Sequence, residues 1–277
     1  MITRACISIN NRCNLDCNYC HFHEKQESIC DIPMDVFKIL DNIRAHIAKH
    51  DLKLFKLGFV GNGEPFLDFV ALCSYIEHID DLLLSGTIAA YTITNGTLIN
   101  RERIEYLSAH KVNIGISLDG LEEIHNKWRS HSYKKVMQNI ELYHDVVGHY
   151  PALNCTVGKD VLDRADETIA FFARFGSRIT FSRMIGQYGI SLDEFNAFLD
   201  KAALYLNVRR GGYDCTIYGG KCGAGMDNIF YANGSIYVCG NCIDLPYACS
   251  SDTPLDEVLF PVPMFYRNLC FKEVATR

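Results

Sequence analysis

The sequence has no apolar run long enough to cross a membrane. No stretch of its 277 residues approaches the roughly 18 to 20 consecutive apolar residues of a membrane-spanning helix. The opening residues, MITRACISINNRC, also lack the apolar stretch behind a basic start that marks a secretory signal. We therefore expect a cytoplasmic protein with no membrane partner.

An excess of positive charge is also missing. Lys and Arg total 27 against 33 Asp and Glu, which leaves a formal net charge of -6. A nucleic-acid backbone would meet net repulsion, so no nucleic-acid partner is expected. The acidic balance instead suits a small cationic substrate, with Asp227, Asp244 and Asp252 as candidate ammonium partners.

Cysteine, in contrast, is abundant, and its placement is uneven. The 13 cysteines include four within the first 20 residues and six from residue 215 onwards. The number is odd, there is no secretory signal, and the chain is long enough to bury its own core, so a disulfide scaffold is not favoured. The pattern predicts metal or cluster ligation at both ends of the chain.

Apolar runs bounded by turn residues alternate with segments of helical period over most of the length. The predicted strands cover residues 3–9, 54–60, 87–94, 112–118, 152–157 and 178–182, and the predicted helices cover 34–49, 69–79, 101–110, 133–147, 163–175 and 192–206. Six such units predict an α/β fold with a partial (β/α)6 TIM-like barrel over residues 1–206.

Glycine pairs and most of the remaining cysteines follow residue 206, which predicts a smaller second domain over residues 207–277. Within it, Asn233-Gly234 predicts a two-residue hairpin turn between strands at 228–232 and 235–239, because both turn positions favour positive φ. Short helices are expected at 254–259 and 264–269.

Three cysteines directly follow the first predicted strand, in the spacing C-x3-C-x2-C: Cys13, Cys17 and Cys20. Three thiolates on one loop can hold a cubane cluster and leave one iron without a protein ligand, whereas electron-transfer clusters use four cysteines. A zinc site completed by His21 or His23 needs the same residue types and remains an alternative.

This loop resembles that of the radical S-adenosylmethionine (SAM) superfamily, in which an aromatic residue such as Tyr19 precedes the last cysteine. The resemblance implies that Cys13, Cys17 and Cys20 hold a [4Fe–4S] cluster whose open iron binds SAM. It also implies an electron donor such as flavodoxin or ferredoxin, and cleavage of SAM to a 5′-deoxyadenosyl radical that takes hydrogen from the substrate.

Three further segments at the ends of predicted strands resemble the same family. The segment GNGEP (61–65) is similar to its G-G-E-P segment, which implies that the Gly63 backbone and the Glu64 carboxylate meet the ammonium group of SAM. Asn95 lies in TNGT (94–97) and is assigned to the cofactor site. The stretch 116–129 is close to that of anaerobic sulfatase-maturating enzymes, which implies that Ser117 and Arg129 contact SAM.

The carboxyl-terminal cysteines resemble a SPASM/twitch domain through the spacing C-x11-G-x4-C, formed by Cys222, Gly234 and Cys239. The small number of later cysteines favours the twitch form, with one auxiliary [4Fe–4S] cluster. Its implied ligands are Cys215, Cys222, Cys239 and a fourth, for which Cys242 is preferred over Cys270. A zinc ribbon, C-x6-C-x16-C-x2-C, is the alternative.

Cys249 falls outside this spacing. An S–H bond is weaker than a C–H bond, so a spare thiol near the site can quench a substrate carbon radical. The layout resembles twitch-domain aminoglycoside epimerases, such as neomycin epimerase. It implies an isomerase of antibiotic biosynthesis that inverts a carbon of an aminoglycoside or amino sugar, with Cys249 as the catalytic hydrogen donor. The other cysteines are predicted to be buried core thiols: Cys6, Cys30, Cys73 and Cys155.

Other functions remain open. A radical SAM dehydrogenase of a secondary alcohol is one alternative, although Gly240 stands where the sulfatase-maturating relatives carry an acidic base. Modification of a ribosomal peptide is another, with no amino-terminal peptide-recognition domain evident in the sequence. A non-catalytic zinc-binding module would leave the motifs at the strand ends unexplained.

Overall fold

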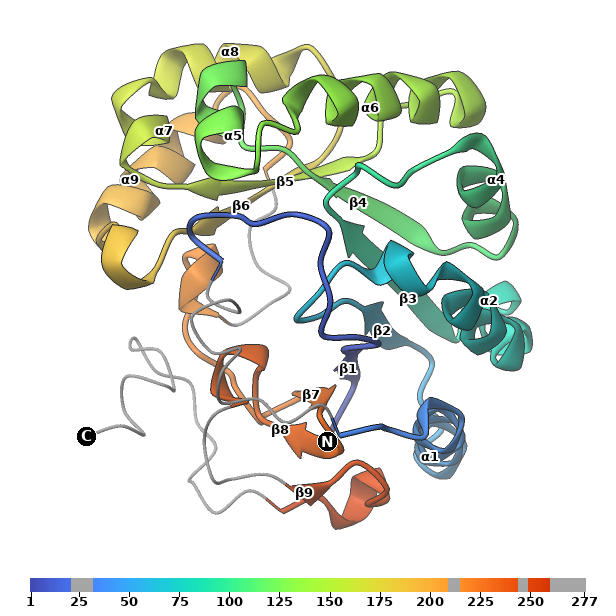
Figure 1. Ribbon diagram of the computed structural model, residues 1–277. Helices are drawn as coiled ribbons and strands as arrows, with labels where there is room; N and C mark the ends of the chain where they lie inside the picture. Colours follow the sequence, from blue (N-terminus) through green and yellow to red (C-terminus); the bar gives the residue numbers. More distant parts are fainter. Residues whose placement is uncertain (21–31, 209–214, 244–248, 260–277) are drawn as a thin grey trace.

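A single curved sheet forms the frame of the protein in the computed structural model, which describes residues 1–20, 32–208, 215–243 and 249–259 (Figure 1). The first six strands lie side by side in chain order, each parallel to its neighbour. They are β1 (Arg4–Ile7), β2 (Phe55–Phe59), β3 (Ile88–Thr94), β4 (Asn113–Ser117), β5 (Ala152–Val157) and β6 (Ile179–Arg183). The α/β class with a mostly parallel sheet is confirmed, and this strand order fits the predicted partial barrel.

Helices cover the outer side of the sheet (Figure 1). Their bounds are α1 (Val36–Lys49), α2 (Phe69–His78), α3 (Asp80–Leu84), α4 (Arg101–Ala109), α5 (Glu122–Trp128), α6 (Tyr133–Val147), α7 (Lys159–Asp163), α8 (Ala165–Ala173) and α9 (Leu192–Ala202). Local signals set several ends: Asp35 caps α1, Ser191 and Glu194 form a capping box on α9, and Gly148 ends α6 with φ 86°. The short helices α3, α5 and α7 were not predicted.

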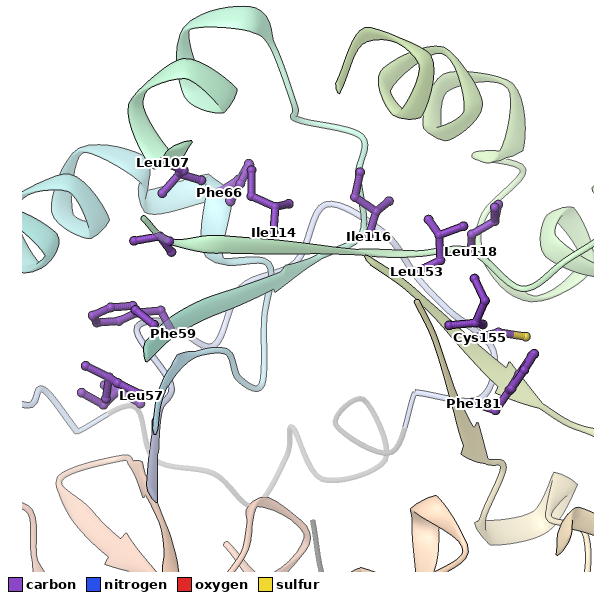
Figure 2. Close-up of a cluster of buried hydrophobic side chains, with 14 of the residues drawn as sticks. Leu57, Phe59, Phe66, Leu107, Ile114, Ile116, Leu118, Leu153, Cys155 and Phe181 are labelled. Atoms are coloured by element: carbon purple, nitrogen blue, oxygen red, sulfur yellow. The ribbon is translucent and has the colours of Figure 1, made fainter. Parts of the chain in front are cut away.

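The main core lies between the strands and these helices. Alternate residues of each strand point to the helix side, as strand geometry requires, and Figure 2 shows Leu57, Phe59, Ile114, Ile116 and Leu153 on this side. All five side chains are at most 3% exposed. Burial of apolar area at this interface is the main stabilising contribution to the barrel, and it holds the carboxyl ends of the strands in one row.

The later strands extend the same sheet. β7 (Asn228–Ala232) pairs in parallel with β1, while β8 (Ser235–Tyr237) and β9 (Cys249–Ser250) add antiparallel strands beyond it. Asn233 and Gly234 adopt φ values of 48° and 73°, so the predicted hairpin turn is confirmed. A short helical turn, η6 (Leu255–Glu257), lies within the predicted helix 254–259. The predicted helix 264–269 lies outside the described residues, and the domain division at residue 206 stays a prediction.

In the part of the chain that the structure describes, no helix combines the length and apolar character needed to span a membrane.

Candidate functional site

The three cysteines of the C-x3-C-x2-C motif share the loop that follows β1. None of the three is in a disulfide, Cys13 is exposed, and Cys17 and Cys20 are half-buried. Burial raises the pKa of the Cys17 thiol to about 11 against the pull of Arg129, and the charges of the other two thiols add to the rise. Three reduced thiols therefore share one loop and influence one another's titration, which is compatible with ligation of a single cluster.

The end of α5 holds this loop in place. The backbone N–H of Asn18 donates to the carbonyl of Trp128 at 3.1 Å, and the Asn18 side-chain amide donates to the carbonyl of Lys127 at 2.9 Å. The Asp16 N–H donates to Ser130 Oγ at 2.9 Å, and Ser130 itself adopts φ 51°. The cysteine loop is thus positioned by residues more than a hundred places later in the chain.

A buried acid–base cluster lies beneath the loop. Asp119, 1% exposed, accepts from Tyr19 Oη at 2.6 Å and from Arg129 Nε at 2.7 Å, while its other oxygen accepts from the Thr156 N–H at 2.9 Å. The guanidinium of Arg129 also stands 5.4 Å from the centre of the Tyr19 ring. Burial alone would lower the pKa of Arg129, but Asp119, Tyr19 and Cys17 together outweigh it and raise that pKa above its usual value. Arg129 is therefore a buried, paired cation.

Sequence reasoning did not assign a role to Asp119 or to His125 behind it. His125 Nδ1 accepts the Asp119 backbone N–H at 3.2 Å, which leaves Nε2 to donate to Ser132 Oγ at 3.0 Å. Ser132 Oγ in turn donates to the carbonyl of Arg129 at 2.7 Å. Burial lowers the pKa of His125 to about 4, so the ring is neutral at pH 7. The one available signal was the position of Asp119 in a Leu-Asp-Gly turn at a strand end.

Glu64 connects the ends of β2 and β3. Its side chain is 2% exposed, and one carboxylate oxygen accepts from Thr94 Oγ1 at 2.6 Å and from the Phe66 N–H at 3.0 Å. The other oxygen accepts from the Asn95 N–H at 2.7 Å. Burial raises the pKa of Glu64 while these hydrogen bonds oppose the rise. Glu64 thus shapes the loops, and its contact with SAM stays a prediction.

The glycine at position 63 is needed because the cysteine loop crosses directly over it. A Cβ on Gly63 would lie 2.2 Å from the Arg12 carbonyl oxygen and 2.2 Å from Asn10 Oδ1. The Glu64 N–H donates to that same Arg12 carbonyl at 2.7 Å. From the next strand end, Asn95 Nδ2 lies 3.8 Å from Cys13 Sγ.

The predicted cofactor residues therefore gather at one edge of the sheet. Ser117, 8% exposed, ends β4 in the same row of carboxyl termini. The assembled set is Tyr19, Gly63, Glu64, Asn95, Ser117 and Arg129. Carboxyl ends of parallel barrel strands are the usual place for an active site.

The predicted auxiliary ligands are only partly described. Cys215 precedes a helical turn, Cys222 is 6% exposed, and Cys239 Sγ accepts from the Asn241 N–H at 3.4 Å. The side chain of Cys242 and all of Cys270 lie outside the described residues. The auxiliary cluster and its ligand set stay predictions.

Backbone pairing places Cys6 and Cys249 on opposite faces of the sheet. Cys6 pairs with Phe230, and Cys249 pairs with Ile236. Residues paired across neighbouring strands point to the same face, and successive residues along one strand point to opposite faces. Phe230 pairs with Tyr237, so Cys6, Phe230 and Tyr237 share one face. Ile236 is next to Tyr237, so Ile236 and its partner Cys249 lie on the other face. The packing agrees, since Ile236 belongs to the main core while Cys6 packs with Phe230 and Tyr237 on the other side. Cys249 thus lies on the helix-covered face of the sheet. Its role as hydrogen donor stays a prediction.

The prediction of four buried core thiols is only partly correct. Cys155 is fully buried, but Cys6 and Cys73 are only half-buried, and Cys30 lies outside the described residues. Cys6 Sγ lies 3.4 Å from Tyr91 Oη on the face away from the main core. Periodicity could not assign that face, because strands of a barrel carry apolar residues on both sides.

Comparisons with known proteins agree with this geometry. The model of the Radical SAM superfamily matches residues 7–171. The cysteine-type anaerobic sulfatase-maturating enzyme of Clostridium novyi is 28% identical over 213 residues, which cover 69% of this chain and 56% of that enzyme. Streptococcus suis SuiB bound to the precursor peptide SuiA has a TM-score of 0.74 at 15% identity, over 95% of this chain and 65% of SuiB. Native anSMEcpe with bound AdoMet and Cp18Cys peptide has a TM-score of 0.71 at 18% identity, over 92% of this chain and 79% of that one.

The likeness to these solved structures shows the fold alone, and the matched span covers little more than half of the Clostridium novyi enzyme. The match to the family model supports more than a shared fold. It covers more than half of this chain and includes the three-cysteine loop and the segments that end β2, β3 and β4. The chain therefore belongs to the radical SAM superfamily.

Proposed function

We propose that this radical SAM enzyme modifies a peptide or protein substrate. The main support for radical SAM chemistry is the position of the three-cysteine loop at the carboxyl ends of the barrel strands. Asp119, Tyr19 and Arg129 hold the loop there through hydrogen bonds. The peptide assignment is supported by the similar fold of SuiB and anSMEcpe, both of which are known with a bound peptide. The prediction of an aminoglycoside epimerase has no support among these relatives.

The residues of the loop fit the cofactors that the family implies. Cys13, Cys17 and Cys20 would hold a [4Fe–4S] cluster, since all three are reduced and share one loop. Together with SAM, this cluster supplies hydrogen-atom abstraction from an unactivated carbon. Glu64 keeps the ends of β2 and β3 together beside it, and Arg129 keeps Tyr19 and the loop in position.

The three candidate ammonium partners give the prediction of an aminoglycoside substrate no positive support. Of the candidate ammonium partners, Asp252 already pairs with Lys38 of α1 at 2.8 Å. The backbone carbonyl of Asp227 accepts from the N–H groups of Thr3 and Arg4, and Asp244 lies outside the described residues. The proposal keeps an auxiliary cluster on Cys215, Cys222, Cys239 and Cys242, and a one-electron donor such as flavodoxin or ferredoxin.

Substrate-dependent turnover tests the peptide assignment. The protein is reconstituted anaerobically with iron and sulfide and given SAM, a reductant, and either a peptide library or a panel of aminoglycosides in deuterated water. We expect peptide-dependent formation of 5′-deoxyadenosine and a mass change in a peptide. Turnover of an aminoglycoside with one deuterium incorporated, and none of any peptide, would contradict the proposal and restore the epimerase. Cys73→Ser, on α2 outside the site, is the matched active control.

A further inference from the structure

Two histidines and an aspartate meet where α1 contacts η6, away from the cysteine loop. His46 lies in the last turn of α1, His50 is the C-cap residue one turn later, and Asp256 belongs to η6. His46 Nδ1 and His50 Nε2 lie 2.8 Å and 2.7 Å from the same oxygen, Asp256 Oδ1. These three atoms all lie within 4.8 Å of one another, so a single ion could contact them all.

The orientation of His46 is fixed from behind. Its side chain is 4% exposed, and Nε2 lies 2.9 Å from the backbone carbonyl of Ile2. A carbonyl that accepts from one ring nitrogen and leaves the other facing the site is the usual support of a metal-binding histidine. Both ring nitrogens of His46 therefore face oxygen atoms, but a neutral ring carries a hydrogen on only one of them. When Nε2 donates to the Ile2 carbonyl, Nδ1 has a lone pair that can bind a divalent cation.

We propose that His46 Nδ1, His50 Nε2 and Asp256 Oδ1 bind a zinc ion. Two imidazoles and one carboxylate are ligands that zinc accepts, and the partly exposed side of the cluster leaves a fourth position for water. Ile2 precedes β1, so the ion would lie at the amino-terminal end of that strand, opposite the edge that carries the cysteine loop. The proposal is independent of the substrate of the enzyme.

The ion would fasten the segment after β9 to α1. Other contacts already join the two: Lys38 pairs with Asp252 at 2.8 Å, and Asn42 donates to the Asp252 carbonyl at 3.2 Å. Lys49 Nζ lies 2.7 Å from the second oxygen of Asp256, and its side chain is 65% exposed. This ammonium competes electrostatically with a bound cation, so its removal is expected to tighten zinc binding.

Zinc binding to the iron-loaded holoprotein tests the site. Equilibrium dialysis against zinc, followed by metal analysis, should find one zinc more per chain in the wild type than in Asp256→Asn or His50→Ala. His78→Ala removes a histidine that pairs with Asp41 and packs against Phe37 on the same side of the barrel, and it should bind as much zinc as the wild type. Lys49→Met should bind zinc about twofold to fivefold more tightly.

Limited proteolysis supplies a second readout that does not depend on zinc held elsewhere. Zinc should slow cleavage of the segment 251–257 in the wild type and in His78→Ala, and should have no effect in Asp256→Asn. His50 and Asp256 are partly exposed, so both variants should keep the iron absorbance and circular dichroism of the wild type. Equal zinc content in the wild type and Asp256→Asn, or zinc-independent proteolysis of the wild type, would overturn the proposal.

Discussion

At the scale of single residues, Asp119 is the group on which the site depends most. Its carboxylate neutralises the buried Arg129, orients Tyr19 next to Cys20, and caps the Thr156 N–H. A buried charge that loses its partner is costly, because water cannot replace the lost interaction. Sequence motifs identified Arg129 and Tyr19, but only the fold shows that one acid joins them.

We expect Asp119→Asn to leave Arg129 unpaired and to lower the free energy of unfolding by about 3 kcal/mol. It should also reduce the iron retained after reconstitution, because Tyr19 no longer holds the cysteine loop. Asp166→Asn is the matched control, since Asp166 pairs with the exposed Lys201 and its loss should cost less than about 1 kcal/mol. Urea denaturation and iron analysis measure both effects, and equal losses in the two variants would contradict this role of Asp119.

His125 predicts a pH dependence of stability. Its pKa falls to about 4 in the folded chain because of burial, whereas an unfolded histidine titrates near its ordinary value of about 6.5. The unfolded state therefore binds the extra proton first, and stability should fall as the pH drops from about 6.5 to about 4, by at most about 3 kcal/mol. Urea titrations of the apoprotein at several pH values check this. If the free energy of unfolding of His125→Gln depends on pH in this range as it does in the wild type, His125 is not the source of the dependence.

Cys249 and Cys6 lie on opposite faces of the sheet, which bears on the hydrogen-donor role predicted for Cys249. Cys249 lies on the helix-covered face, whereas Cys6 lies on the other face beside Tyr91. We expect Cys249→Ala to keep substrate turnover within about twofold of the wild type, because the Cys249 thiol lies on the helix-covered face of the sheet, with Ile236 of the main core. Loss of product with SAM cleavage intact would instead establish Cys249 as the hydrogen donor.

At the scale of elements, periodicity predicted all six parallel strands and the hairpin within two residues at each end. It failed for α3, α5 and α7, which have 5 to 7 residues each and are too short to show a helical period. The failure at α5 matters, because this helix ends in the residues that hold the cysteine loop. Such contacts join segments far apart in the sequence and leave no local pattern.

The crossing of two loops at Gly63 can be tested directly. In Gly63→Ala the new methyl group would meet the Arg12 backbone carbonyl, which cannot move without shifting the cysteine loop. We expect a loss of about 1 to 3 kcal/mol in the free energy of unfolding. Iron content after reconstitution should also fall. Wild-type stability and iron content in Gly63→Ala would show that the loops do not cross as closely as described.

At the scale of the whole molecule, the carboxyl-terminal hairpin continues the barrel sheet through the pairing of β7 with β1. This places Cys239, at the end of the hairpin, close enough to Cys6 of β1 for its charge to affect the Cys6 thiol, whose pKa burial raises to about 11. The sequence predicted the hairpin but not its partner strand, because the Asn-Gly turn specifies only the local pairing. Membership of the radical SAM superfamily rests on residues 7–171, which contain the strands β2 to β5.

Reductive cleavage of SAM is the most direct test of the central claim. The reconstituted protein, given SAM and dithionite without oxygen, should form 5′-deoxyadenosine and methionine. Cys17→Ala should form neither above background, while Cys73→Ser should match the wild type. A wild-type protein that holds zinc in place of iron at the three-cysteine loop, or Cys17→Ala that cleaves SAM as fast as the wild type, would contradict the account.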